Sequence, residues 1–459
     1  MGKSGKSSNL YMGVDVGGTK IQATLVEESG SVLARNRRPT PREVSPEQSV
    51  EAIASAVADL LGEEKIAPDD LAAIGIAVPG VVDPDAGVVV VTPNMALSGV
   101  SIVPRLEERF GVPVALGNDT NMGALGERWL GAGRDADSVL GVFVGTGIGG
   151  GFVQGTALMR GYRGSACEVG HMIMEINGPL CGCGNRGCME ALASRTAIER
   201  DIRMRIASGE KSVVTELMGE DARVIRSGVL RDALTEGDEV VTGVLHRASE
   251  VLGLGLLTIR HVLDPEVTVL GGGVVEACGS FMLPIVQGIL DADALAGSRP
   301  PRPVRLAALG DDAVAMGAVA LAREAAGRSV FSKKYQTLPE YPKIESANPG
   351  EVVIGGKSYS RDARIHVNGK SKGRKKSLVQ GLEEPGPHVG LREVRKVCKG
   401  GPEVLFIGIG FDQPVAVSEE AVRFCRDRHM ECEIGPTGEI VEAYNCCKRR
   451  KAALLRVYS

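Results

Sequence analysis

The pattern of apolar and polar positions along the first 325 residues predicts an α/β chain. Short runs rich in branched residues predict strands at 11–17, 21–26, 72–78, 88–91, 112–116, 140–145, 152–154, 267–270 and 304–306. Apolar residues at helical spacing predict helices at 45–62, 101–110, 120–129, 196–205, 240–262 and 312–323. Strands that alternate with helices in this way are typical of layered α/β folds.

A second pattern follows a polar linker at 326–340. Two hairpins come first, and the second of them turns at Asn368-Gly369. The next predicted elements alternate as strand, helix, strand, helix and strand, at 404–409, 418–429, 431–434, 438–448 and 452–457. We therefore expect a separate small α/β domain over residues 341–459, and a disordered tail over residues 1–9.

Composition narrows the class of protein. A chain of 459 residues suggests two to four domains, and a formal net charge of −4 gives no electrostatic reason to expect nucleic-acid or membrane binding. No apolar run looks long enough to span a bilayer. Ten cysteines without a secretion signal favour reduced thiols and metal ligands, so the cytoplasm is the expected compartment.

A glycine turn follows the first predicted strand. Asp15 ends that strand, and Gly17, Gly18, Thr19 and Lys20 form the turn. The residues after it alternate like a strand, so this first glycine turn closes a hairpin and does not open a helix as Rossmann and P-loop turns do. Its backbone N–H groups can still cradle phosphates, and Asp15 could hold Mg²⁺ through water.

The same device occurs again at residues 145–151, between the strand that ends near 145 and a return strand at 152–154. This second glycine turn includes Thr146 and Gly147. Two such units predict a duplicated lobe, in which facing hairpins hold phosphates from both sides. The alternative is a pair of unrelated glycine hairpins.

Asn118 and Asp119 stand where a predicted strand gives way to a helix. Folds of the α/β class place chemistry at the carboxyl ends of strands, so Asp119 is a candidate catalytic carboxylate. An ordinary helix N-cap would have the same sequence. Local signals leave both readings open.

The segment from Glu168 to Glu190 carries a set of metal ligands, namely His171, Cys181, Cys183 and Cys188. Three thiolates and one imidazole complete a tetrahedral zinc site with no position for water, so the site would be structural. The alternative is three reduced cysteines in a turn, but the glycines between them offer thiols little to pack against. We expect zinc to fold this loop so that Glu168, His171 and Glu190 face a polar substrate.

Together these residues resemble a ROK-family sugar kinase of the glucokinase type. The resemblance spans roughly residues 10–325 and is carried by the following motifs: Asp15-Val-Gly-Gly-Thr-Lys20, Asn118-Asp119, Gly145-Thr-Gly-Ile-Gly-Gly150, Glu168-x-Gly-His171 and Cys181-Gly-Cys-Gly-x-x-Gly-Cys188-x-Glu190. It implies an α/β fold of duplicated actin-like, ribonuclease H-type lobes with ATP in the cleft between them. The implied lobes are residues 10–125, with 310–325 packing back onto them, and residues 126–309 with the zinc loop.

The resemblance also implies roles for the site residues. Asp119 would be the base that takes a proton from a sugar hydroxyl. The implied sugar ligands are Asn118, Glu168, His171, Glu190, Asn94 and Gly80. The implied contacts to ATP and its Mg²⁺ are Asp15, Gly17, Gly18, Thr19, Lys20, Thr146, Gly147 and Gly272.

The implied activity is ATP-dependent phosphorylation of a hexose, with glucose first among the acceptors. Glucokinases of the family carry a tryptophan a few residues after Thr-Pro-Asn94, and this sequence has none there. N-acetylmannosamine, N-acetylglucosamine and fructose therefore stay open as acceptors, as does a sugar-binding scaffold without catalysis. Regulators of the family carry a helix-turn-helix before the first strand, for which residues 1–9 are too few. Family members are often dimers or tetramers, so a homo-oligomer is expected.

Residues 341–459 resemble another family, the small domain typified by NADH dehydrogenase 1 alpha subcomplex assembly factor three. The segments that carry the resemblance are Gly350–Tyr359, Pro402–Gly410, Pro436-Thr437 and Glu442–Asn445. That family implies no particular chemistry for this part of the chain.

Overall fold

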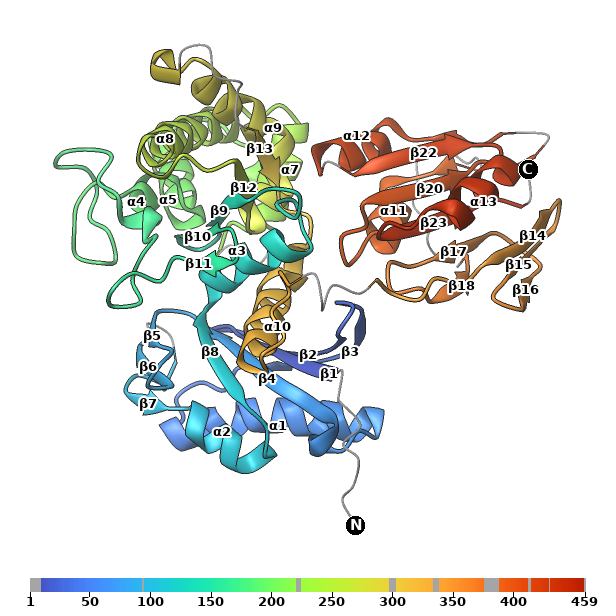
Figure 1. Cartoon of the computed structure of the whole chain (residues 1–459). Coiled ribbons are helices and arrows are strands. Elements are labelled where there is room, and N and C mark those ends of the chain that lie inside the picture. Colours follow the sequence, from blue (N-terminus) through green and yellow to red (C-terminus); the bar gives the residue numbers. More distant parts are fainter. Residues whose placement is uncertain are drawn as a thin grey trace.

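The computed structural model describes residues 10–92, 95–219, 224–296, 303–332, 338–374, 388–411, 414–428 and 430–457. The tail predicted at 1–9 and the candidate sugar ligand Asn94 lie outside these ranges. Figure 1 shows two lobes, one above the other, with a third body beside them.

The N-terminal lobe is built on a mixed five-stranded sheet with the order β3-β2-β1-β4-β8. β1 pairs antiparallel with β2 and parallel with β4, while β8 is parallel to β4. Its strands are β1 (Leu10–Val16), β2 (Lys20–Glu27), β3 (Val32–Pro39), β4 (Leu71–Val78) and β8 (Val114–Asn118). A small sheet of β5 (Val81–Asp83), β6 (Val88–Val91) and β7 (Val100–Ser101) flanks it. Helices α1 (Pro46–Glu64) and α2 (Val103–Phe110) cover one face of the main sheet (Figure 1).

The second lobe repeats this plan. Its sheet has the order β11-β10-β9-β12-β13, with the same sequence of antiparallel and parallel pairs. The strands are β9 (Ser138–Val144), β10 (Ile148–Gln154), β11 (Ala157–Leu158), β12 (Val267–Gly271) and β13 (Val304–Leu306). The helices are α4 (Met189–Ala193), α5 (Arg195–Ala207), α6 (Val214–Leu217), α7 (Ser227–Thr235), α8 (Glu239–Leu263) and α9 (Gly273–Asp291). The predicted duplication is confirmed by this matching strand order.

Two helices, one packed on each lobe, contact each other closely through their backbones. α3 (Asp119–Trp129) packs on β9 and β10 of the second lobe, and α10 (Ala313–Ala325) packs on β1 and β4 of the first. The two helices cross where Gly126 and Gly317 face the partner backbone. A Cβ on Gly317 would lie 1.8 Å from the Met122 carbonyl oxygen, and one on Gly126 would lie 2.1 Å from that of Ala313. Only glycine permits this approach of one helix backbone to the other.

The second lobe contains two helices, α8 and α9, that are longer and more apolar than the sequence analysis expected of any segment. α8 and α9 are long and apolar enough to cross a membrane by length and composition alone. The prediction that no apolar run reaches that length was therefore wrong. α8 and α9 pack against each other, and the buried side chains of both belong to the core of this lobe. Their apolar character thus has a use inside the fold.

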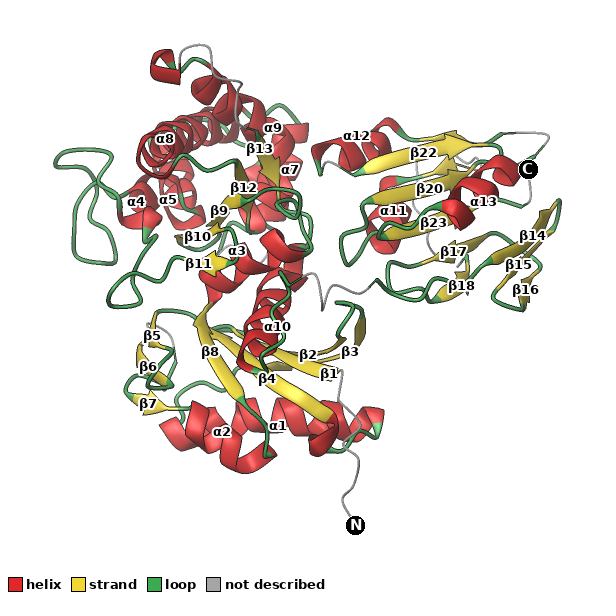
Figure 2. Ribbon diagram, in the orientation of Figure 1, coloured by secondary structure: helices red, strands yellow, loops and turns green. Residues whose placement is uncertain are grey.

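The C-terminal region, residues 338–457, has its own sheets and its own apolar cores. The main sheet has the order β18-β17-β23-β20-β22, in which β20 runs parallel to β22 and β23. Its strands are β17 (Ala363–Ile365), β18 (Ser371–Gly373), β20 (Val404–Gly408), β22 (Glu431–Gly435) and β23 (Lys451–Leu455). Smaller sheets contain β14 (Ile344–Asn348), β15 (Glu351–Ile354), β16 (Lys357–Tyr359), β19 (His388–Val389) and β21 (Ala416–Val417). The helices are α11 (Leu391–Val397), α12 (Glu419–Asp427) and α13 (Thr437–Cys446), drawn in red in Figure 2.

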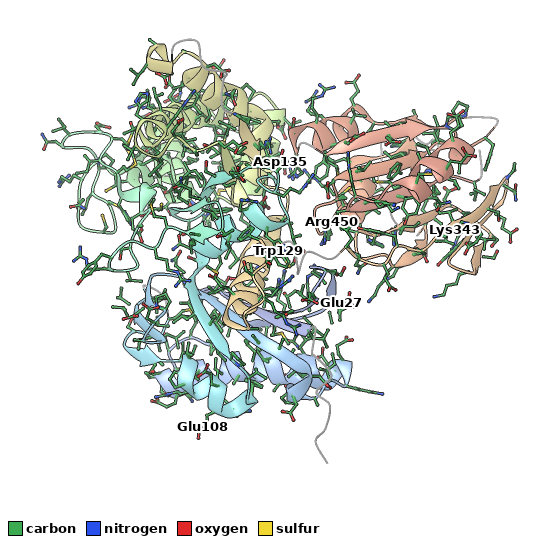
Figure 3. All side chains as sticks on the ribbon, in the orientation of Figure 1. Glu27, Glu108, Trp129, Asp135, Lys343 and Arg450 are labelled. Carbon is green, nitrogen blue, oxygen red and sulfur yellow. The ribbon has the colours of Figure 1, made fainter. Side chains whose placement is uncertain are left out.

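Arg450 attaches the C-terminal region to the N-terminal lobe. It lies on the face of the region that is turned toward the lobes (Figure 3) and is only 4% exposed. Its guanidinium donates to the carbonyl oxygens of Ser29 at 2.9 Å and Gly30 at 3.3 Å, and also to that of Gly400 in its own region at 3.1 Å. The Asn368 side-chain amide adds a bond of 3.1 Å to the carbonyl oxygen of Val32. The region is thereby bonded to the β2–β3 hairpin.

Replacing Arg450 tests this attachment. Arg450→Ala leaves buried carbonyl groups without donors, each at a cost of about 1–3 kcal/mol. We expect a lower thermal midpoint and faster proteolysis between residues 326 and 340. The neighbouring Arg449→Ala is the matched control, because Arg449 is 47% exposed and pairs with Glu431 at the surface. Equal effects of the two substitutions would contradict the role assigned to Arg450.

Candidate functional site

The first glycine turn joins β1 to β2 at the edge of the N-terminal lobe. The Gly17 N–H donates to the Lys20 carbonyl oxygen at 2.8 Å and closes the hairpin. Thr40 holds the turn from outside, because its hydroxyl donates to the Gly17 carbonyl oxygen and its N–H donates to that of Thr19. The Gly17 N–H is thus engaged in shaping the turn, which leaves Gly18 and Thr19 as its outward-facing part.

The second glycine turn is shorter than its sequence suggested. Only residues 145–147 form the turn, because β10 begins at Ile148. The Gly145 N–H donates to the Gly147 carbonyl oxygen at 2.9 Å. The glycines that follow belong to a strand, which corrects the predicted turn at 145–151.

Glu190 braces this second turn. One of its carboxylate oxygens, Oε2, accepts from the Ile148 N–H at 2.9 Å. A Cβ on Gly147 would lie 2.2 Å from the same oxygen, so a larger residue there would displace the Glu190 carboxylate. The other oxygen, Oε1, lies 3.5 Å from the Cys181 thiol, which donates to it. Glu190 therefore links the turn to the cysteine loop, a contact that the sequence reading did not foresee.

The two turns face one cavity. It has a volume of about 660 Å³ and lies between the lobes. Gly18 and Thr19 line it from the first turn, Thr146 lines it from the second, and Met95 and Ala96 line it from the segment between β6 and β7. Of the described residues predicted for the site, only Gly18, Thr19 and Thr146 line it, and Asp119, Glu168 and Gly272 do not. Gly272 is the N-cap of α9, directly after β12, with a φ of +85°.

Asp119 is the first residue of α3, at the carboxyl end of β8. The N-cap is Asn118, whose Oδ1 accepts from the Asn121 N–H at 3.0 Å and from the Thr120 hydroxyl at 2.8 Å. The Asn118 amide donates to the Gly80 carbonyl oxygen at 2.9 Å, which joins β8 to the turn after β4. Because Asn118 caps the helix, the capping alternative for Asp119 is wrong.

Carboxylates gather around Asp119. Burial, with the charge of Glu168 nearby, raises its pKa above the usual range, although its Oδ1 accepts from the Thr120 N–H at 2.8 Å. Burial and the charge of Asp119 raise the pKa of Asp15 to about 6. Asp15, Asp119 and Glu168 therefore share one electrostatic environment. A divalent cation bound among these carboxylates would reduce the repulsion between their negative charges.

The four predicted zinc ligands do meet. The ligand atoms of His171, Cys181, Cys183 and Cys188 all lie within 4.8 Å of one another. His171 Nδ1 is 3.6 Å from Cys181 Sγ, and Cys183 Sγ is 3.7 Å from Cys188 Sγ. Zinc–sulfur bonds of about 2.3 Å place tetrahedral sulfur atoms about 3.8 Å apart. The donor set and its spacing therefore fit zinc, with His171 Nδ1 turned to the metal position and Nε2 left for another partner.

Other predicted residues take supporting places. Glu168 precedes a short 3₁₀ helix, η2 (Val169–His171), so it and His171 stand at opposite ends of one turn. Lys20 begins β2 and forms an ion pair of 3.7 Å with Asp311. Asp311 lies in a second 3₁₀ segment, η4 (Gly310–Asp312), which leads into α10. The sequence reading missed Asp311, because its neighbour in space is far away in the chain.

Two further residues at the second turn were also missed. The Arg195 guanidinium donates to the Thr146 hydroxyl at 2.9 Å, and the Thr196 hydroxyl donates to the Thr146 carbonyl oxygen at 2.8 Å. Both start α5, directly after Ser194, which caps that helix. The Ser-Arg-Thr start of this helix was the available signal.

Comparison with known proteins places these features in a family. The sequence model of the ROK family matches residues 11–325. The glucokinase of Thermotoga maritima is 35% identical over 281 residues, which are 61% of this chain and 87% of that protein. The DNA-binding transcriptional dual regulator NagC of Escherichia coli is 30% identical over 68% of this chain and 75% of its own length. A solved ROK-family glucokinase from Streptomyces griseus, in complex with glucose and AMPPNP, is 34% identical with a TM-score of 0.61, over 69% of this chain and 99% of that one. The resemblance drawn for residues 341–459 lies outside the family match and stays a prediction.

The cysteine cluster gives a first prediction for this site. We expect the purified chain to contain about one zinc per molecule, and Cys188→Ser to lose it together with protection of residues 172–188 from protease. Zinc in small structural sites contributes roughly 10–16 kcal/mol to folding, so local disorder should follow its loss. Metal analysis by mass spectrometry measures the content. Cys446→Ser is the control, because Cys446 is exposed and lies outside the cluster.

Asp15 gives a prediction about stability and pH. Because its pKa is raised to about 6 in the folded protein, folding is favoured while Asp15 is protonated, and that gain is lost as the pH rises through 6. Asp15→Asn should therefore stabilise the ligand-free protein at pH 7.5 by roughly 2–3 kcal/mol, and should add little below pH 4. Thermal unfolding at both pH values measures this. The exposed Asp69→Asn makes the same chemical change and should leave both midpoints unmoved.

Proposed function

Because the chain belongs to the ROK family and is an ATP-dependent sugar kinase, we propose that it transfers the terminal phosphoryl group of ATP to a hexose hydroxyl, with glucose as the first acceptor to test. The observation that carries the proposal is the meeting of two glycine turns at one cavity, which Thr19 of the first turn and Thr146 of the second both line. Backbone turns of this kind bind phosphate oxygens through N–H groups.

We assign the base to Asp119. In phosphoryl transfer the protein contributes mainly positioning and stabilisation of charge. A hydroxyl that attacks phosphorus must also lose its proton, and a carboxylate at the carboxyl end of β8 can accept it. The raised pKa of Asp119 makes it a stronger base than an exposed aspartate. The Thr120 N–H and the N-terminal end of α3 keep the carboxylate in place.

The sugar would be held by the segment that the zinc site shapes. His171 turns Nδ1 to the ligand cluster, so its Nε2–H can donate to a hydroxyl. Glu168 can accept hydroxyl protons beside Asp119. Asn118 and Glu190 have their polar atoms engaged within the protein, Asn118 with Gly80 and Asn121, and Glu190 with Ile148 and Cys181. As sugar ligands they would therefore share these bonds, and their first role is to position the site.

The metal that accompanies ATP would be held by Asp15. A divalent cation there would supply positive charge to the phosphate oxygens during transfer. The crowding of Asp15, Asp119 and Glu168 gives such a cation a favourable site, because its charge would offset the burial and the carboxylate repulsion that raise the pKa of Asp15. Lys20 and Arg37 lie near the same carboxylate and lower its pKa, which keeps part of its charge available.

The choice of sugar would also depend on residues outside the first glycine turn and the zinc loop, among them the segment after Asn94. The run Met95–Val100 has no tryptophan, so one wall of the sugar site differs from that of the glucokinase resemblance. Glucose, N-acetylmannosamine, N-acetylglucosamine and fructose should be compared directly. A site that binds hydroxyls discriminates strongly against a sugar that leaves its polar groups unpaired.

A substitution at Asp119 tests the assignment. Asp119→Asn keeps the size of the side chain and an acceptor for the Thr120 N–H, but removes the base. We expect kcat to fall by about 10²–10⁴-fold while sugar affinity changes little. An assay of ADP release with Mg-ATP over the sugar panel measures kcat, and calorimetry measures sugar binding. The exposed Asp85→Asn serves as the control.

Two outcomes would contradict the proposal. Full turnover in Asp119→Asn would make Asp119 a structural residue. Sugar binding without ADP release in the unaltered chain, for every sugar of the panel, would instead support a scaffold without catalysis.

A further inference from the structure

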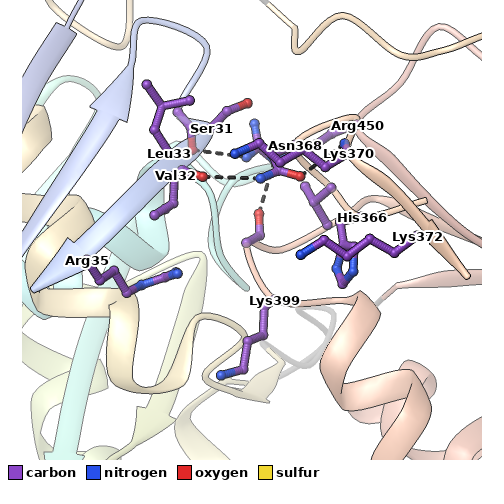
Figure 4. A pocket seen from close by; sticks show the side chains of 13 residues that line it. Ser31, Val32, Leu33, Arg35, His366, Asn368, Lys370, Lys372, Lys399 and Arg450 are labelled. Carbon is purple, nitrogen blue, oxygen red and sulfur yellow. Dashed lines mark hydrogen bonds between the residues drawn. The ribbon is translucent and has the colours of Figure 1, made fainter. Parts of the chain in front are cut away.

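A second cavity lies where the C-terminal region meets the N-terminal lobe. It has a volume of about 210 Å³. One wall comes from the β2–β3 hairpin, at Gly30–Leu33 and Arg35, and the other from residues 366–368, 370, 372, 399, 400 and 450. Figure 4 shows the side chains of both walls turned toward this space. This cavity is separate from the one between the two glycine turns, with which it shares no lining residue.

The charged residues that line the cavity are all basic. It includes Lys370, Lys372, Lys399, Arg35 and Arg450, and no aspartate or glutamate. Arg35 is held by Asp312 through bonds of 3.0 and 2.7 Å, and Arg450 is bound to backbone carbonyl oxygens. Among the described residues, the ammonium groups of the three lysines have no ion-pair partner. Three exposed lysines thus line a hollow whose described lining contains no carboxylate.

His366 is a half-buried side chain in the lining of this cavity. It lines the wall beside Lys372, and burial together with Arg364, Lys372 and Lys396 lowers its pKa to about 4. Its imidazole is therefore neutral at pH 7 and adds no charge to the lining. A concave site with charge of one sign concentrates ions of the opposite sign, and an anion there would remove the repulsion among the lysines.

From these observations we propose that this cavity, between the β2–β3 hairpin and the C-terminal region, is a binding site for a small dianionic phosphate group, either inorganic phosphate or the phosphate of a phosphorylated sugar. Its volume is below the roughly 300–1,000 Å³ of pockets for drug-sized ligands, which suits a ligand of this size and not a nucleic acid. Lysine ammonium groups bind phosphate as point charges. The Asn368 amide, already bonded to Val32, fixes the separation of the two walls.

The position of the cavity connects it to the rest of the molecule. The hairpin that forms one wall is anchored by Arg450, and its strand β3 carries Arg35 to Asp312. A phosphate in the cavity would bridge the lysines of the C-terminal region and the hairpin of the lobe. It would thus add a contact at the boundary that Arg450 and Asn368 already define.

Binding to the full-length chain tests the proposal. Calorimetry with inorganic phosphate and, separately, with glucose 6-phosphate is done at low ionic strength, where screening is weak. The variant Lys370→Gln, Lys372→Gln, Lys399→Gln should weaken phosphate binding by at least about tenfold. The matched control Lys343→Gln, Lys357→Gln, Lys448→Gln removes the same charge from exposed positions outside the cavity. It should change binding less than twofold.

A second readout locates the ligand. Phosphate should move the imidazole proton resonance of His366, identified by its loss in His366→Gln, in the unaltered chain and in the control triple variant. Equal affinity of phosphate for the cavity variant and the unaltered chain would overturn the proposal, as would an unmoved His366 resonance at saturation. If the triple cavity variant loses the tighter binding of glucose 6-phosphate relative to inorganic phosphate, the sugar adds contacts in this cavity; glucose 6-phosphate that binds the variant and the unaltered chain equally well would lie in the cleft and would count against the sugar phosphate as ligand here.

Discussion

The contact between the backbones of α3 and α10 is the constraint on which the cleft depends. α3 carries Asp119 at its start and packs on the sheet of the second lobe, while α10 packs on the sheet of the first. Gly126 and Gly317 bring the two helices together so closely that no side chain fits between them. At the end of α3, Glu127 is fully buried and accepts the N–H groups of Ala132, Ala308 and Leu309. The helix that presents the proposed base is therefore tied to both chain segments that pass between the lobes.

The cysteine loop acts on the cleft through a single side chain. Glu190 stands two residues after Cys188 and accepts from both the Cys181 thiol and the Ile148 N–H. A metal would bind Cys181 as a thiolate and remove the proton of the first contact. Order that the metal imposes on Cys188 could still reach the second glycine turn through Glu190, because its carboxylate accepts from Ile148 and contacts the turn at Gly147. The cysteine loop and the second glycine turn are thus in contact through Glu190.

The C-terminal region contacts the N-terminal lobe at the β2–β3 hairpin, which leads directly to the first glycine turn. The β2–β3 hairpin that receives Arg450 and Asn368 shares strand β2 with the first glycine turn. Arg35 and Arg37 of β3 reach Asp312 and Asp311, and Asp311 also pairs with Lys20. Strands β2 and β3 and these ion pairs therefore join the boundary of the C-terminal region to the first glycine turn. This is a physical connection, and only measured coupling energies would make it a regulatory one.

The sequence by itself determined the duplicated α/β lobes, the two glycine hairpins and the zinc ligand set, because each depends on local spacing. Alternation of apolar residues defines strands, and cysteines close in the chain must meet around a metal. It did not determine the extent of the second turn, since glycines at 149–151 fit a strand once β9 is beside them. Nor could it place Asp311 beside Lys20, Glu190 against Ile148, or Arg450 against Ser29. Those contacts join residues that are distant in the chain, and only the packing of lobes and helices brings them within bonding distance.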